Sequence, residues 1–122
     1  MVEWKTARTA QFLRDLERYG KKHPSELAAV IRNLDMYFDT LKRLGNPMQV
    51  QAGFIHHGPD GIKEIDQKGK TKTKLQQTRL YVFPDIERGT LHLLKIGDKN
   101  SQTADIRFSR EMVKEIKSGG GY

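Results

Sequence analysis

The chain has 122 residues, the size of one ordinary domain, which disfavours a two-domain enzyme with a cofactor cleft between its domains. It carries 22 Lys and Arg against 15 Asp and Glu, a net charge of +7 that favours polyanionic partners. Cysteine is absent, which excludes disulfides, zinc-thiolate sites and thiol nucleophiles. We find no apolar run of membrane-spanning length and no signal-peptide core, so we expect a cytoplasmic protein without a membrane partner.

The first half predicts a short strand and two helices. Apolar and charged residues alternate over residues 2–5, a pattern typical of an edge strand. Apolar residues then recur every three or four positions from Thr9, which predicts a helix ending near Gly20. Pro24 suits the first turn of a second helix, whose apolar stripe runs over residues 27–44 before Gly45, Asn46 and Pro47 end it. The short join between the helices predicts an antiparallel helix hairpin.

The second half has the period of strands. Residues 61–66, 78–83 and 90–96 are rich in branched and aromatic side chains, and Gly or Pro bounds each segment. Their short joins predict an antiparallel meander, and we expect Pro84 to end the middle strand because proline cannot donate to a central ladder. Alternation around Phe54 leaves a further strand in residues 46–60 open.

A third helix is predicted from Ser101, because apolar residues again recur at helical spacing. Its apolar face is predicted to contain Ala104, Phe108, Met112, Val113 and Ile116. The predicted fold is therefore α+β, in the order β-α-α-β-β-β-α, with an N-terminal helix hairpin packed on a small antiparallel sheet and a C-terminal helix. We expect residues 1–118 to form one domain and residues 119–122 to form a flexible tail. We expect the sheet face away from the hairpin to be partly open and to carry the functional residues.

Basic residues concentrate between the first two strands of the meander. Residues 63–79 hold six basic and two acidic side chains. Four of the lysines alternate with period two, so in an extended segment they would all point the same way. One interpretation is a solvated hairpin loop; the other is an arm that binds RNA phosphates without reading sequence. The candidate RNA-binding residues are Lys68, Lys70, Lys72 and Lys74.

Arg79 is the most specific single candidate. Under strand alternation its side chain shares a face with Tyr81 and Phe83, and Glu64 on the preceding strand is a possible partner. Because the guanidinium fork suits phosphate as well as carboxylate, we expect either a structural ion pair or an anion contact.

The histidines give weak signals. His56 and His57 are adjacent, so on a strand they would point to opposite faces, and His92 within an apolar strand is expected to be a hydrogen-bonded core residue. No HxH or HExxH spacing occurs, and no Gly-rich phosphate loop. We therefore assign no metal and no cofactor, and a nucleotide-dependent enzyme is disfavoured.

Three short motifs occur in a characteristic order. They are Gly61-Ile62-Lys63-Glu64-Ile65, Arg79-Leu80-Tyr81 and Gly97-Asp98-Lys99. In this order, after a helix hairpin, they resemble the RelE/HigB group of toxin–antitoxin toxins. The resemblance covers most of the chain and implies a compact toxin fold, messenger RNA cleavage on the ribosome, and neutralisation by a cognate antitoxin.

The resemblance also implies site residues. Lys63, Arg79 and Lys99 fall where the family has basic active-site residues, and Glu64 matches an acidic position of the HigB-like motif. The chain departs from the family in two respects: the lysine-rich stretch is longer than usual, and no tyrosine or histidine stands near the C-terminal end of the domain. Glu64, Tyr81 or His92 are then the fallback proton carriers, and Lys63 would be a base only if neighbouring cations lowered its pKa.

The predicted function is therefore that of a type II toxin acting as a metal-independent, ribosome-dependent messenger RNA endoribonuclease. Its partners would be an antitoxin protein, messenger RNA and the ribosome. Two alternatives stay open, because one fold can carry several functions. One is a ParE-like inhibitor of DNA gyrase; the other is a basic nucleic-acid-binding module without activity.

Overall fold

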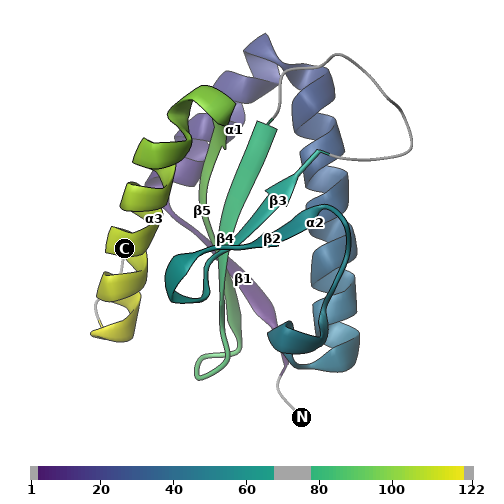
Figure 1. The fold of residues 1–122 in the computed structure, drawn as a ribbon, viewed down its shortest axis with the longest axis vertical. Coiled ribbons are helices and arrows are strands. Elements are labelled where there is room, and N and C mark those ends of the chain that lie inside the picture. The colour runs from purple at the N-terminus through teal and green to yellow at the C-terminus, as the bar shows by residue number, and fades with distance from the viewer. Residues whose placement is uncertain (1–2, 68–77, 120–122) are drawn as a thin grey trace.

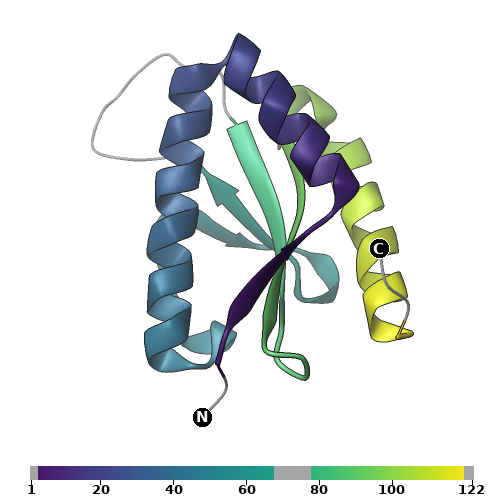
Figure 2. The ribbon, with the colours of Figure 1, turned by 180° about the vertical axis from the view of Figure 1, so that it is seen from behind.

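The computed structural model describes residues 3–67 and 78–119 (Figures 1 and 2). The strands form one five-stranded sheet in the order β1-β5-β4-β3-β2, with α1 and α2 on one face and α3 on the other. The predicted α+β class is confirmed, and β2 is the further strand that alternation around Phe54 left open. The elements are β1 (Lys5–Arg8), α1 (Ala10–Lys22), α2 (Pro24–Leu44), η1 (Pro47–Gln49), β2 (Ile55–His57), η2 (Pro59–Gly61), β3 (Lys63–Asp66), β4 (Thr78–Asp85), β5 (Thr90–Asp98), η3 (Lys99–Ser101) and α3 (Gln102–Lys117).

Helix α1 begins where the sequence predicts and ends later. The Thr9 side-chain oxygen accepts the backbone N–H of Phe12 at 2.9 Å, which caps the first turn. The helix then continues through Gly20 to Lys22, so the predicted end at Gly20 is wrong. Pro24 sets the end instead, because a proline disfavours helical backbone at the residue before it.

Helix α2 follows at once, with Pro24 in its first turn as predicted. It ends at Gly45, which adopts a left-handed φ of 75° and donates its N–H to the Leu41 carbonyl at 2.8 Å. Residues Val30 and Leu41 are fully buried against the sheet. Although α2 is the longest helix in the described part of the chain, no described helix is both long and apolar enough to cross a membrane.

The sheet is mixed, whereas the sequence predicts an antiparallel one. Strands β2, β3, β4 and β5 form the expected antiparallel meander. Strand β1 pairs with β5 in parallel, from Lys5 opposite Thr90 to Arg8 opposite Leu93. A short turn fixes the relative direction of two consecutive strands only. Strand β5 follows β1 by more than eighty residues, so no turn fixes the direction of β1 and the antiparallel prediction is wrong there.

Pro84 lies inside β4 and does not end it. Residue 84 pairs with Leu91 on β5, and β4 continues to Asp85. The other neighbour, β3, pairs with β4 only as far as Val82. At Pro84 the strand therefore has an edge on that side, where proline's missing N–H costs no ladder hydrogen bond. The predicted end of the strand at Pro84 is therefore wrong, because the prediction assumed that β4 has a neighbour on both sides along its whole length.

Two apolar clusters lie on the two faces of the sheet. The larger joins α1 and α2 to the sheet; the smaller joins α3 to β4 and β5 through Tyr81, Leu94, Val113 and Ile116, with neighbours. Helix α3 therefore covers part of the face that we expected to be open. Its buried side differs from the predicted one, since Ala104 is exposed while two polar residues, Asp105 and Ser109, are buried.

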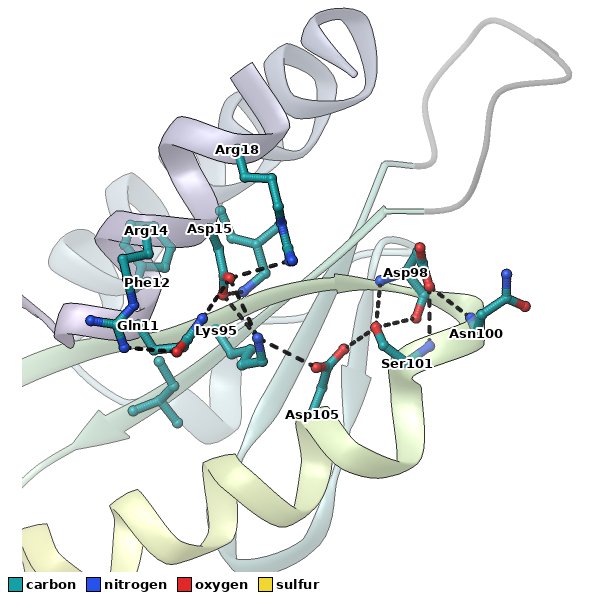
Figure 3. Close-up of polar contacts among 12 residues, drawn as sticks. Gln11, Phe12, Arg14, Asp15, Arg18, Lys95, Asp98, Asn100, Ser101 and Asp105 are labelled. Atoms are coloured by element: carbon teal, nitrogen blue, oxygen red, sulfur yellow. Dashed lines mark hydrogen bonds and ion pairs between the residues drawn. The ribbon is translucent and has the colours of Figure 1, made fainter. Parts of the chain in front are cut away.

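Strand β5 changes neighbours halfway along its length. Its pairing with β1 ends at Leu93, and beyond that point helix α1 lies beside it. Asp15 on α1 is only 1% exposed, and its side chain points toward Lys95 on β5 (Figure 3). The Asp15 carboxylate accepts the backbone N–H of Ile96 at 3.1 Å and forms an ion pair with Lys95 Nζ, also at 3.1 Å. Lys95 also lies 3.7 Å from Asp105 on α3, so this edge of β5 joins both helix layers.

Helix α3 approaches β5 most closely at Gly97. A Cβ atom there would lie 1.7 Å from Asp105 Oδ2 and 2.7 Å from Ser101 Oγ, so only glycine fits. Ser101 donates its hydroxyl to Asp105 at 2.6 Å. Burial raises the pKa of Asp105, and the Ser101 hydrogen bond opposes that rise.

Gly97→Ala is expected to destabilise the fold by about 1–3 kcal/mol, because the added methyl group displaces the buried Asp105 carboxylate. Gly53→Ala is the matched control, since no atom lies within 4 Å of a Cβ at that position. The control should change the free energy of unfolding by less than about 0.5 kcal/mol. Urea denaturation of the two variants measures both; equal stabilities would contradict the close approach of α3 to β5.

Candidate functional site

Two predicted site residues form an ion pair on the sheet face that α3 partly covers. Arg79 Nη1 on β4 donates to Glu64 Oε1 on β3 at 3.1 Å. The Glu64 side chain is 8% exposed and that of Arg79 19% exposed, so the pair is mostly withdrawn from solvent. Arg79 Nε is buried and has no hydrogen-bond partner among the described residues. The predicted pairing is confirmed, and it leaves part of the guanidinium unsatisfied.

A second pair lies beside the first. His56 Nε2 on β2 lies 2.6 Å from Asp66 Oδ2 on β3. The aspartate is buried, whereas 37% of the histidine side chain is exposed. Because the carboxylate accepts, Nε2 carries the hydrogen, and a neutral imidazole then has its lone pair on Nδ1. The pair therefore holds a histidine in one orientation at the protein surface.

Strand register places both pairs on one face. His56 lies opposite Glu64, and Asp66 lies opposite Arg79, so alternation turns all four side chains the same way. The histidine and arginine backbones are separated by two strand spacings across the sheet and by two residues along it, about 12 Å in all. Gln102, the first residue of α3, extends Nε2 to within 3.4 Å of Glu64 Oε1. We call these five residues the polar sheet face.

Lys63 does not belong to the polar sheet face. It pairs with Val82, whose side chain lies in the apolar cluster under α1 and α2, so strand alternation places Lys63 opposite to Glu64. Its Nζ lies 2.6 Å from His57 Nδ1. Burial lowers the pKa of Lys63, which differs from the predicted cause, a crowd of cations. The structure thus separates Lys63 from the other candidate catalytic residues.

Lys99 lies in the short η3 turn that precedes α3. It is exposed on η3, and within the described part of the chain it makes no ion pair. Because η3 leads directly into Gln102, this lysine stands three residues from a member of the face. The candidate RNA-binding lysines at positions 68, 70, 72 and 74 lie outside the described residues, as do residues 120–122 of the predicted tail.

Two fallback proton carriers are poorly placed. Tyr81 is fully buried, and its pKa is raised by burial and by the negative charge of Glu64. His92 is buried five positions from Gly97 along β5, with Nε2 3.3 Å from Asp85 Oδ2. Burial lowers its pKa and the contact with Asp85 opposes that effect. His92 is thus the hydrogen-bonded core histidine that the sequence predicts.

The polar sheet face combines the groups needed for acid–base chemistry at a phosphate. His56 offers an oriented proton acceptor, and Arg79 offers a cation for developing negative charge. Among the described residues, no group of three or more His, Asp and Glu is arranged to hold a metal ion.

Sequence reasoning missed the His56–Asp66 pair. The signal was present in the two isoleucines that flank it, since Ile55 pairs with Ile65 in the β2–β3 hairpin. Aligning these apolar residues across the turn at Gly58–Gly61 places His56 opposite Glu64. Predicting the pair thus required the register between β2 and β3, and the residue pattern of a single strand does not give that register.

Comparisons of the chain with models of protein families, with curated proteins and with solved structures give no match.

The Glu64–Arg79 pair is expected to show strong coupling in a double-mutant cycle. Arg79→Gln leaves a buried carboxylate without its cation, so it should cost more stability than the double change to Glu64→Gln and Arg79→Gln. We expect a coupling energy of about 1–3 kcal/mol from denaturant unfolding. The exposed pair Asp39–Lys42 is the matched control and should show no measurable coupling. Equal coupling in the two cycles would contradict the burial of the pair.

Proposed function

We propose that this chain is the toxin of a type II toxin–antitoxin pair, and that it cleaves messenger RNA on the ribosome without a metal ion. Two observations support the proposal: the ordered motifs of the sequence and the chemistry of the polar sheet face. The observation that carries it is that a partly exposed arginine, Arg79, and an oriented histidine, His56, lie on one face of a basic protein.

The proposed reaction uses the ribose 2′-hydroxyl as nucleophile. His56 Nδ1 accepts the hydroxyl proton while the 2′-oxygen forms a bond to phosphorus. Arg79 stabilises the added negative charge of the phosphorane, with Lys99 as a second cation beside it. The bond to the 5′-oxygen then breaks, and that oxygen takes a proton from water. The hydroxide that remains takes the proton from His56, which restores the base. The products are a 2′,3′-cyclic phosphate and a 5′-hydroxyl end, so the atoms balance without a cofactor.

Neutralisation by an antitoxin completes the proposal. An acidic antitoxin segment would mask the cations of a chain with net charge +7, and charge complementarity would speed its association. Apolar side chains of such a segment have a place to bind beside the helix hairpin. There a groove of about 320 Å³ is lined by Phe12, Leu16, Ile31 and Phe38, among others.

Arg79→Lys is expected to abolish messenger RNA cleavage while the protein stays folded. Lysine keeps the positive charge opposite Glu64 but loses the fork that contacts the phosphate, and losing such a contact costs about 10²–10³ in rate. Arg88→Lys is the matched control, because Arg88 also pairs with a buried carboxylate, Asp85, at 3.0 Å on a distant turn. Inducible expression followed by mapping of messenger RNA ends measures both variants.

Full toxicity of the Arg79→Lys variant would remove this residue from the reaction. Growth arrest with DNA damage and with unchanged messenger RNA ends in the unsubstituted protein would overturn the ribonuclease proposal and favour a gyrase inhibitor. A protein that arrests nothing and binds RNA without cleaving it would be the plain binding module.

His56→Gln is expected to lower the cleavage rate by about 10²–10⁴, because the base that takes the 2′-hydroxyl proton is lost. His92→Gln is the control, since it replaces the other histidine that contacts an aspartate. Single-turnover cleavage in a purified translation mixture with programmed ribosomes gives the rates, and circular dichroism checks that both variants fold. Unchanged cleavage by His56→Gln would exclude the His56–Asp66 pair from catalysis.

A further inference from the structure

A polar cavity lies away from the polar sheet face, between the last turn of α1 and η3. Its volume is about 250 Å³. That is below the roughly 300–1,000 Å³ typical of pockets for drug-sized ligands, so it suits a small group such as a phosphate with its sugar. The cavity is lined by Arg18, Tyr19, Lys22, His23, Asp98 and Ser101.

Two cations on α1 face this cavity. Arg18 and Lys22 are four residues apart, so they lie on the same side of the helix. The Arg18 guanidinium lies 5.4 Å from the centre of the Tyr19 ring, and only Nη2 contacts Asp15, at 3.4 Å. Lys22 is exposed and makes no ion pair within the described residues. Neighbouring Lys21 differs, since it pairs with Glu17 at 3.2 Å and does not line the cavity.

The rest of the lining limits what the cavity holds. The C-terminal end of α1 carries partial negative charge, and the Asp98 carboxylate stands on the opposite wall. Affinity for an anion must therefore come from the two cationic side chains. His23, whose ring centre lies 5.7 Å from that of the mostly buried Tyr19, adds a flat surface against which a sugar can pack.

The cavity is continuous in sequence with the polar sheet face. Asp98 and Ser101 line the cavity, and the next residue, Gln102, contacts Glu64. Exposed Lys99 lies on the η3 turn between them. On the sheet, Arg79 is paired with Gly97, the residue just before Asp98. Among the described residues, η3 is the element between Arg79 and the cavity, so an RNA strand bound at Arg79 would reach the cavity by running over this turn.

We propose that this cavity binds one backbone phosphate of the same RNA strand whose scissile phosphate lies at Arg79, with Arg18 and Lys22 as its ligands. This inference rests on the proposed function. It assigns a positioning site outside the polar sheet face, so substrate binding extends around the end of β5 onto helix α1. The site recognises the RNA backbone and therefore adds affinity and register without reading bases.

The test compares two double variants of equal charge. Arg18→Gln with Lys22→Gln removes both cavity cations, while Lys21→Gln with Lys42→Gln removes two lysines of other surfaces. The ligand is a fluorescent single-stranded 2′-O-methyl RNA, which the protein cannot cleave because the nucleophile is blocked. Fluorescence anisotropy over a range of salt concentrations gives the affinity and its salt dependence.

We expect the cavity variant to bind several-fold more weakly and to lose about 0.7 from the slope of log K against log salt, the value for one phosphate on a single strand. The control variant should keep both the slope and the affinity. Equal losses in the two variants would overturn the site and leave a general charge effect.

A further arm separates the substrate strand from ribosomal RNA. If the cavity variant binds the oligonucleotide normally but sediments less with ribosomes, the phosphate belongs to the ribosome and the inference is overturned. Because the oligonucleotide reports binding alone, the inference and the proposed function fail separately. If the cavity variant binds the oligonucleotide normally and still cleaves messenger RNA, only the cavity site is contradicted. If binding depends on the cavity but the unsubstituted protein never cleaves RNA, only the ribonuclease proposal is contradicted.

Discussion

The carboxylate of Asp15 takes the place of a neighbouring strand for the second half of β5. Where β1 ends, the backbone N–H of Ile96 would face the packed side of α1 without a partner, and a buried unpaired donor costs about 1–3 kcal/mol. Asp15 accepts that hydrogen and also pairs with Lys95, whose ammonium reaches Asp105 on the other side of the sheet. One buried carboxylate thus allows a helix to cover a sheet edge, and it fixes α1 and α3 relative to the same strand.

The candidate site depends on this junction. The N-terminal end of α3 is held at Gly97 by its close contact with Asp105, and that position brings Gln102 to Glu64. A buried cluster of charged groups is weak support for stability, because the cost of removing charges from water offsets much of their attraction. Here the cluster serves to position other residues, because it sets where η3 begins. The η3 turn lies between the polar sheet face and the cavity beside α1.

Local signals predicted the helices and the meander, because capping residues and period-two alternation act within a few residues of chain. Gly45 ended α2 as expected, and the Glu64–Arg79 pair followed from the alternation of two adjacent strands. The errors lie where distant segments decide the outcome. Three features depend on which other element packs against the segment. They are the direction of β1, the tolerance of Pro84 within β4 and the buried side of α3. Lys63 and His56 needed a strand register, and register is set by pairing across the sheet.

The parallel pairing of β1 with β5 constrains how the protein is made. Strand β1 is synthesised long before its partners, which run from the Gly89 carbonyl that accepts the Lys5 N–H to the Leu94 carbonyl that accepts the Thr9 hydroxyl. The sheet therefore cannot close until β5 has left the ribosome, and a loop of more than eighty residues must be closed at that step. A nascent chain interrupted before β5 can pair β2, β3 and β4, but it lacks the strand that joins β1 to them, so β1 is left without a strand neighbour.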